Sequence, residues 1–112
     1  MRVLKFGGTS VANAERFFNV ADIALKTASQ SETALVLSAP AKITNLLVAL
    51  VQAGASGQDG KEELAQIRAI VEPIITTCAE KHPNFDKDKV LDEFNVTMAL
   101  IKRRIEGIRS MP

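Results

Sequence analysis

A lysine, two glycines and two hydroxyl side chains stand next to one another near the start of the chain, in the segment Lys5-Phe6-Gly7-Gly8-Thr9-Ser10. Glycines let a backbone approach a bound anion closely and adopt positive φ. A lysine contributes a positive charge, and the unpaired N–H groups at the start of a helix contribute donors. The combination is suited to a phosphate or a carboxylate. A tight connection between a strand and a helix, with no ligand, is the alternative that these residues leave open.

The glycine turn matches neither of two common nucleotide-binding patterns. A Walker A loop carries its lysine after the glycines, whereas Lys5 precedes Gly7 and Gly8. The dinucleotide fingerprint, Gly-x-Gly-x-x-Gly, has a different glycine spacing. An anion site in this segment is therefore of another kind.

Two short apolar runs are expected to form the strands that position this turn. Residues 2–6 and 33–37 are brief apolar segments ended by small residues, a pattern typical of strands buried on both faces. The intervening segment, about 11–29, has helical spacing of apolar residues, and Ser10 is a candidate N-cap for it. A strand, a helix and a strand in this order predict parallel pairing with a right-handed crossover.

A second loop ends at the same predicted edge of the sheet. Ser38 follows the second strand, and Thr44 lies at the start of the next helix, which is expected from Ile43 to about Ala53. The carboxyl ends of parallel strands meet at one edge, so we expect the two loops to face one crevice. Turn formation and helix capping are the common uses of such hydroxyls. These uses do not exclude ligand binding.

The second half of the chain is predicted to be helical. One helix is expected over about 62–81, kinked or interrupted at Pro73, and another over about 86–108. The last helix has an apolar stripe at helical spacing, made of Val90, Phe94, Met98, Ile101, Ile105 and Ile108. The chain is therefore divided into a βαβα unit, 1–53, and a helical segment, 61–109.

Two parallel strands do not make a complete sheet. Sheets usually contain about five or six strands, and parallel strands are covered on both faces. We therefore expect the 112 residues to be the N-terminal part of a larger α/β protein. Unpaired strand edges also favour self-association, so a homo-oligomer is expected.

The bulk composition restricts the possible partners. Fourteen Lys and Arg against thirteen Asp and Glu leave a charge near zero, so neither nucleic acid nor a membrane surface is expected to bind. The basic run at 102–104 lies beside the apolar stripe and is interpreted as a solvated helix face. The single cysteine, Cys78, favours a cytoplasmic location. His82 has no nearby group of ligands, and no metal site is expected.

Two segments resemble the aspartokinase family. Residues 3–11, Val-Leu-Lys-Phe-Gly-Gly-Thr-Ser-Val, are similar to one signature motif of that family, and residues 36–45, Val-Leu-Ser-Ala-Pro-Ala-Lys-Ile-Thr-Asn, to a second. The second segment is most similar to the threonine-sensitive bifunctional branch, in which a homoserine dehydrogenase accompanies the kinase. The resemblance implies an amino-acid-kinase fold, a three-layer α/β/α sandwich. Residues 1–112 would form the N-terminal part of its catalytic domain, with two parallel strands and several helices.

The resemblance also implies an activity. An aspartokinase transfers the γ-phosphoryl of ATP, bound with Mg²⁺, to the side-chain carboxylate of L-aspartate, the first step of threonine, methionine and lysine biosynthesis. NAD(P) is expected only if a dehydrogenase domain follows. The residues carried over are Lys5 as the catalytic cation, Gly7, Gly8 and Ser10 for ATP, and Ser38 and Thr44 for aspartate. The 112 residues alone are expected to be inactive, because the rest of the nucleotide pocket lies outside them.

Two alternatives remain at this level. One is a small helical interaction module whose glycine turn is only structural. The other is a different amino-acid kinase, acting on glutamate or acetylglutamate. The segment 38–45 argues against the second alternative, because it resembles the aspartate-binding loop.

Overall fold

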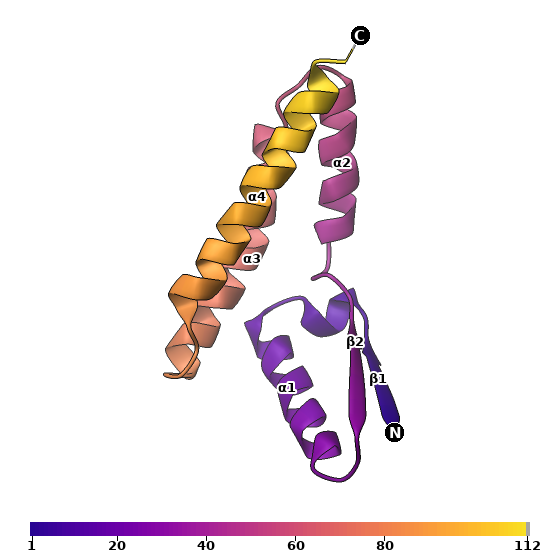
Figure 1. Ribbon diagram of the computed structural model, residues 1–112, viewed down its shortest axis with the longest axis vertical. Helices are drawn as coiled ribbons and strands as arrows, with labels where there is room; N and C mark the ends of the chain where they lie inside the picture. The colour runs from indigo at the N-terminus through magenta and orange to yellow at the C-terminus, as the bar shows by residue number, and fades with distance from the viewer. Residues whose placement is uncertain (112) are drawn as a thin grey trace. The chain divides into compact units, whose positions relative to one another are not determined.

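The computed structural model describes residues 1–111 and contains two parallel strands, four α-helices and a short 3-10 helix (Figure 1). The chain divides into two compact units, Met1–Lys42 and the residues from Ile43 onward. Among the described residues, no helix is both long and apolar enough to cross a membrane. The elements in chain order are β1 (Arg2–Phe6), η1 (Gly8–Val11), α1 (Ala14–Ala28), β2 (Thr33–Leu37), α2 (Ile43–Ala55), α3 (Lys61–Lys81) and α4 (Lys87–Arg109).

The first unit is a βαβ motif. β1 and β2 pair in parallel, in a register that runs from Arg2 opposite Thr33 to Phe6 opposite Leu37, and α1 forms the crossover. One further hydrogen bond extends the ladder at its carboxyl end, where the Ser38 N–H donates to the Phe6 carbonyl at 3.0 Å. The predicted strand boundaries and the parallel pairing are confirmed. The ends of both strands, and the loops after them, therefore lie at one edge.

The first helix begins later than the sequence predicts. Residues 8–11 form η1, in which the Ser10 N–H donates to the Gly7 carbonyl at 3.0 Å. The N-cap of α1 is Asn13, whose Oδ1 accepts from the Arg16 N–H at 3.0 Å. The prediction of Ser10 as the cap is wrong. A tight 3-10 turn occupies the segment after the glycines, and the α-helix starts only after it.

The strands are less buried than their apolar sequences predict. Val3 is 61% exposed, and Leu35, Val36 and Leu37 are 45–50% exposed. Within the first unit a single helix packs on the two-stranded sheet, so one face has no covering helix there. The expectation of strands buried on both faces is wrong for the described residues, and the exposed apolar side chains agree with an incomplete sheet.

The second unit is a packed set of three helices, α2, α3 and α4. α2 is apolar around much of its circumference and packs with the helices that follow it, so the boundary between the compact units falls before α2 and not after it. The buried core of this unit consists of Ile43, Leu50, Ile67, Met98 and Ile105. Phe94, Ile101 and Ile108 pack against that core, which confirms the predicted apolar stripe of the last helix.

Pro73 lies inside α3 without ending it. The helix continues from Lys61 to Lys81, although Pro73 has no N–H to donate to the Ala69 carbonyl. Both Ala69 and Pro73 are exposed, so water can reach that carbonyl. The single helix predicted over about 62–81 is confirmed, and of the two effects expected of Pro73, a kink or an interruption, the interruption is wrong.

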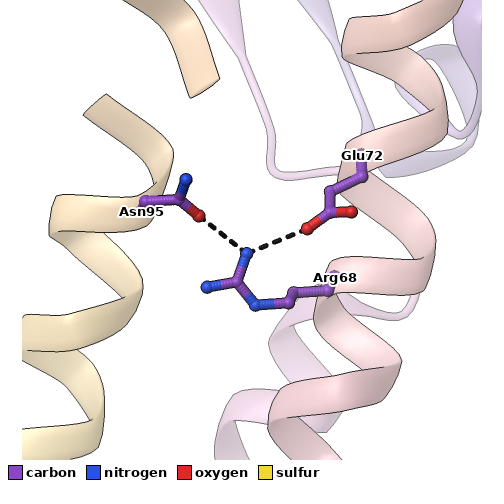
Figure 2. A network of polar contacts seen from close by, with 3 residues as sticks. All are labelled: Arg68, Glu72 and Asn95. Carbon is purple, nitrogen blue, oxygen red and sulfur yellow. Dashed lines mark hydrogen bonds and ion pairs between the residues drawn. The ribbon is translucent and has the colours of Figure 1, made fainter. Parts of the chain in front are cut away.

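An arginine joins α3 to α4 on the surface of the second unit (Figure 2). One guanidinium nitrogen of Arg68 lies 2.9 Å from a Glu72 carboxylate oxygen and donates to Asn95 Oδ1 at 2.7 Å. The same guanidinium lies over the Phe94 ring, with its carbon 5.4 Å from the ring centroid. The ion pair is half exposed and contributes little by itself, so the cross-helix hydrogen bond and the ring contact are what fix the arginine.

Substitutions of the glycines in the loop between α2 and α3 test the packing of the second unit. Gly60 has φ +70°, and a Cβ added there would overlap the buried Leu50 Cδ1. We expect Gly60→Ala to lower the free energy of unfolding by about 2–4 kcal/mol, from left-handed strain and overpacking together. Gly57→Ala is the matched control, because Gly57 has φ +83° but faces open space, and it should cost only about 1 kcal/mol. Urea unfolding of both variants measures the difference, and equal losses would contradict the packing argument.

Candidate functional site

Lys5 lies on the face of the sheet that α1 leaves uncovered. Successive side chains of a strand point to opposite faces, and in β1 the half-buried Leu4 and Phe6 alternate with the exposed Val3 and Lys5. Phe6 lines a small hollow together with residues of α1, which places it on the α1 side. The Lys5 ammonium group has no ion pair within residues 1–111. It is a free cation at the carboxyl end of a strand.

Three consecutive backbone N–H groups follow Lys5 without an internal acceptor. Gly7, Gly8 and Thr9 precede the first hydrogen bond of η1, and none of their N–H groups is bonded within residues 1–111. Nothing lies within 4 Å of the Cβ position of Gly7, so a ligand could approach this backbone closely. Adjacent free N–H groups beside a lysine form an arrangement that suits an anion.

Direct contacts hold the second loop against the glycine turn. The Ala41 N–H donates to the Gly8 carbonyl at 3.1 Å. A Cβ on Gly8 would lie 3.1 Å from the Ala39 carbonyl oxygen and 3.5 Å from the Ala41 Cα. The structure therefore brings residues 7–8 and 38–41 together at one edge, as parallel pairing predicts. The close approach requires glycine at residue 8.

The serine of the glycine turn lies apart from the lysine. Ser10 lines a hollow of about 140 Å³ with Phe6 and with Arg16, Asn19, Val20 and Ile23 of α1. This hollow is on the α1 side of the sheet, whereas Lys5 lies on the other face. Any role of Ser10 in binding a nucleotide stays a prediction.

Ser38 and Thr44 belong to different units. Ser38 is exposed directly after β2 and donates its backbone N–H to Phe6. Thr44 is exposed in the first turn of α2, where it is the second helical residue and not the cap. Neither hydroxyl forms a hydrogen bond within residues 1–111, so both groups are available to a ligand. Their roles with aspartate stay predictions.

The backbone around Lys42 was not anticipated from the sequence. Lys42 has φ +76° and is the only non-glycine residue among 1–111 with positive φ. A side chain in this left-handed region costs about 1–2 kcal/mol. The presence of a lysine at this position does not indicate a positive φ. The small side chains of Ala39 and Ala41 were the available signal for the close approach to Gly8, because larger residues suit a tight loop less well.

Among residues 1–111, neither the thiol nor a group of metal ligands forms a rival catalytic centre. Burial raises the pKa of the Cys78 thiol, so the reactive thiolate is disfavoured at neutral pH. Within residues 1–111 no three His, Cys, Asp or Glu side chains lie close enough together to hold a metal ion. The larger cavities of the second unit contain neither Lys5 nor the glycine turn.

Comparison with known proteins points to one family. No family model matches the chain. The bifunctional aspartokinase/homoserine dehydrogenase of Haemophilus influenzae is 39% identical over 109 residues, which are 97% of this chain and 13% of that protein. The chloroplastic aspartokinase 1 of Arabidopsis thaliana is 39% identical over 101 residues, which are 89% of this chain and 17% of that protein.

The solved structures to which the chain is similar are also aspartokinases. Aspartokinase III of Escherichia coli, in complex with lysine and aspartate, superposes with a TM-score of 0.75 at 32% identity. Its complex with aspartate and ADP gives a TM-score of 0.72 at 35% identity. Each comparison covers 98% of this chain and 23% of the aspartokinase III chain.

This chain is homologous to the N-terminal region of aspartokinases. The resemblance seen in the two motifs is confirmed, and it extends through the helices of the second unit. The fold is mixed α/β, and its structural neighbour has the amino-acid-kinase fold. The chain spans less than a quarter of the length of each aspartokinase compared.

The contact between the two aspartokinase motifs can be tested at the glycines. Gly8→Ala places a Cβ against the Ala39 carbonyl and should weaken the hydrogen bond from the Ala41 N–H to Gly8. We expect hydrogen exchange at the Ala41 amide to become about tenfold faster, the effect of losing roughly 1.4 kcal/mol of local stability. Gly7→Ala is the control, since Gly7 has an ordinary φ of −78° and open space around it. Unchanged exchange in Gly8→Ala, measured by NMR, would contradict the assigned contact.

Proposed function

We propose that residues 1–112 supply the glycine-turn side of the active site of an aspartate kinase. The complete enzyme transfers the γ-phosphoryl of ATP to the side-chain carboxylate of L-aspartate and so begins threonine, methionine and lysine biosynthesis. The proposal concerns the whole protein, of which this chain carries one part of the site. The similar aspartokinase III was solved with aspartate and ADP, which supports both substrates.

The observation that carries the proposal is the contact between the two loops. Gly8 and Ala41 are joined by a 3.1 Å hydrogen bond, and the exposed Lys5 and the free N–H groups of residues 7–9 lie beside that contact. Phosphoryl transfer depends mainly on positioning the reactants and stabilising the charge that develops. A lysine and preoriented N–H groups provide both functions.

The roles follow from the chemistry of each group. Lys5 stabilises negative charge on the transferred phosphoryl group, and the N–H groups of Gly7 and Gly8 bind phosphate oxygens. Ser10 is proposed as a further ATP contact by its place in the glycine turn, although its N–H is bonded to the Gly7 carbonyl and it lines the hollow on the α1 side. The hydroxyls of Ser38 and Thr44 donate to the carboxylates of aspartate.

The remaining components of the complete enzyme belong to the same proposal. Mg²⁺ is proposed to accompany ATP. NAD(P) is used only if a homoserine dehydrogenase accompanies the kinase, and the relatives include proteins named with and without that activity. A cytoplasmic homo-oligomer is proposed, and the exposed Val3, Val36 and Leu37 provide apolar strand surface for assembly.

A chimera tests the function directly. Residues 1–112 replace the corresponding N-terminal region of E. coli aspartokinase III, and aspartate-dependent ADP release is measured. We expect activity from the chimera and none from residues 1–112 alone, because charge stabilisation needs the rest of the pocket. A folded chimera that binds no nucleotide would contradict the proposal.

The catalytic role of Lys5 gives a quantitative prediction for the chimera. Lys5→Ala should lower kcat by about 10²–10³-fold, because it removes a donor from the charge that develops in the transition state. The KM for aspartate should change little, since that charge is small in the ground state. Arg2→Ala is the matched control, as it removes an exposed cation from the opposite end of the same strand. A near-normal kcat for Lys5→Ala would leave the lysine with a structural role only.

Substitutions of Thr44 distinguish a role in substrate binding from a role in helix stability. Thr44→Ala in the chimera should raise the KM for aspartate by about tenfold to a hundredfold, the effect of losing one hydrogen bond to a charged group. The free energy of unfolding should change by less than about 0.5 kcal/mol, because the exposed hydroxyl has no partner within residues 1–111. Thr44→Ser retains the hydroxyl and should retain the KM. Steady-state kinetics and thermal unfolding of both variants distinguish substrate binding from a purely structural role. A loss of stability with an unchanged KM would refute the proposed contact between Thr44 and aspartate.

A further inference from the structure

The second unit contains a groove that the kinase proposal does not use. It lies between α3 and α4, has a volume of about 560 Å³, and contains no residue of the two aspartokinase motifs. That volume is within the usual range for small-molecule sites, about 300–1,000 Å³. The question is what ligand its lining would accept.

Facing positions on two helices build the groove. Lys61, Ala65 and Arg68 are on one face of α3, and Asn95, Ala99 and Lys102 are on the facing side of α4. Arg68 and Asn95, which also line the groove, are joined by the hydrogen bond that Figure 2 shows. Arg68 follows Lys61 by seven helical positions, and at a rise of 1.5 Å per residue the groove extends for about 10 Å.

The middle of the groove is apolar and hollow. Ala65 and Ala99 are small, exposed residues on opposite walls, and Met98, only 4% exposed, lies between them at the base. Larger side chains at the two alanine positions would fill this space. The hollow therefore suits an apolar body such as a ring or a short alkyl chain.

The polar rim consists mainly of donors. The ammonium groups of Lys61 and Lys102 have no ion pair within residues 1–111, and Asp59 is the single carboxylate on the rim. Asn95 uses its oxygen to accept from Arg68, so its amide NH₂ remains free to donate. Arg68 is held in place by the hydrogen bond to Asn95 and by the Phe94 ring, which reduces the entropy lost when it binds a ligand.

We infer that the α3–α4 groove binds a small organic carboxylate with an apolar body. The carboxylate lies between Lys61 and Lys102, and the apolar body occupies the hollow between Ala65 and Ala99. Charge complementarity selects an anion, and the apolar base selects an organic anion over inorganic phosphate. The inference does not depend on the kinase activity.

The test uses the 112-residue chain and 3-phenylpropionate as the probe. Amide chemical shifts are followed by NMR during titration, with 3-phenylpropan-1-ol as the uncharged analogue and acetate as the anion without an apolar body. We expect saturable shifts around Ala65 and Ala99 with phenylpropionate, and at least fivefold weaker binding of each analogue. Equal binding of the alcohol, or shifts centred elsewhere, would overturn the inference.

Two variants separate charge from shape. Lys61→Gln/Lys102→Gln should weaken phenylpropionate binding by roughly five- to tenfold, the loss expected for two exposed ion pairs. Arg103→Gln is the matched control, an exposed cation of α4 outside the groove, and should change binding less than twofold. Ala65→Leu fills the hollow without changing charge and should abolish saturable binding. Equal weakening by Arg103→Gln, or unchanged binding to Ala65→Leu, would refute the site.

Discussion

The parallel pairing of β1 with β2 is the interaction on which the candidate site depends. It aligns Phe6 with Leu37, and the ladder then continues through Ser38, so the two loops leave the sheet at the same level. In this register the Ala41 N–H reaches the Gly8 carbonyl. A shift of one residue would turn Lys5 toward α1 and remove the cation from the open face. The site is therefore determined by strand register before any side chain contributes to it.

Sequence reasoning succeeded where one local pattern determined the structure. The strands at 2–6 and 33–37 and the stripe from Phe94 to Ile105 are short-range signals, and the structure has them at the predicted positions. It failed where two local solutions competed. Ser10 is a good cap by residue type, but the glycines before it favour a 3-10 turn and move the helix start to Asn13. Single residues do not reveal which of two acceptable turns a segment adopts.

Parallel pairing predicts that the two loops lie at one edge, but the individual close contacts could not be predicted, because they depend on atoms far apart in the sequence. Gly8 was predicted to offer its backbone N–H to a phosphate, and the structure adds a second reason for a glycine there, since it leaves room for the Ala39 carbonyl. Gly60 similarly leaves room for Leu50, and Arg68 reaches Asn95 across 27 residues. The left-handed Lys42 carries no residue-type signal. Each of these features results from packing and becomes visible only when the elements are assembled.

The openness of the first unit limits what its groups can do alone. Lys5 and the adjacent N–H groups are oriented, but the sheet around them is half exposed. Two charges 4 Å apart attract by only about 1 kcal/mol in water, and by about 4 kcal/mol where the effective dielectric constant is 20. Stabilising a phosphoryl transition state therefore requires surroundings that exclude water. If the proposed function is correct, the lysine and glycines bind an anion in this chain and become catalytic only when further protein surface covers them. The two motifs are then expected to confer binding on this chain and turnover only on the larger protein.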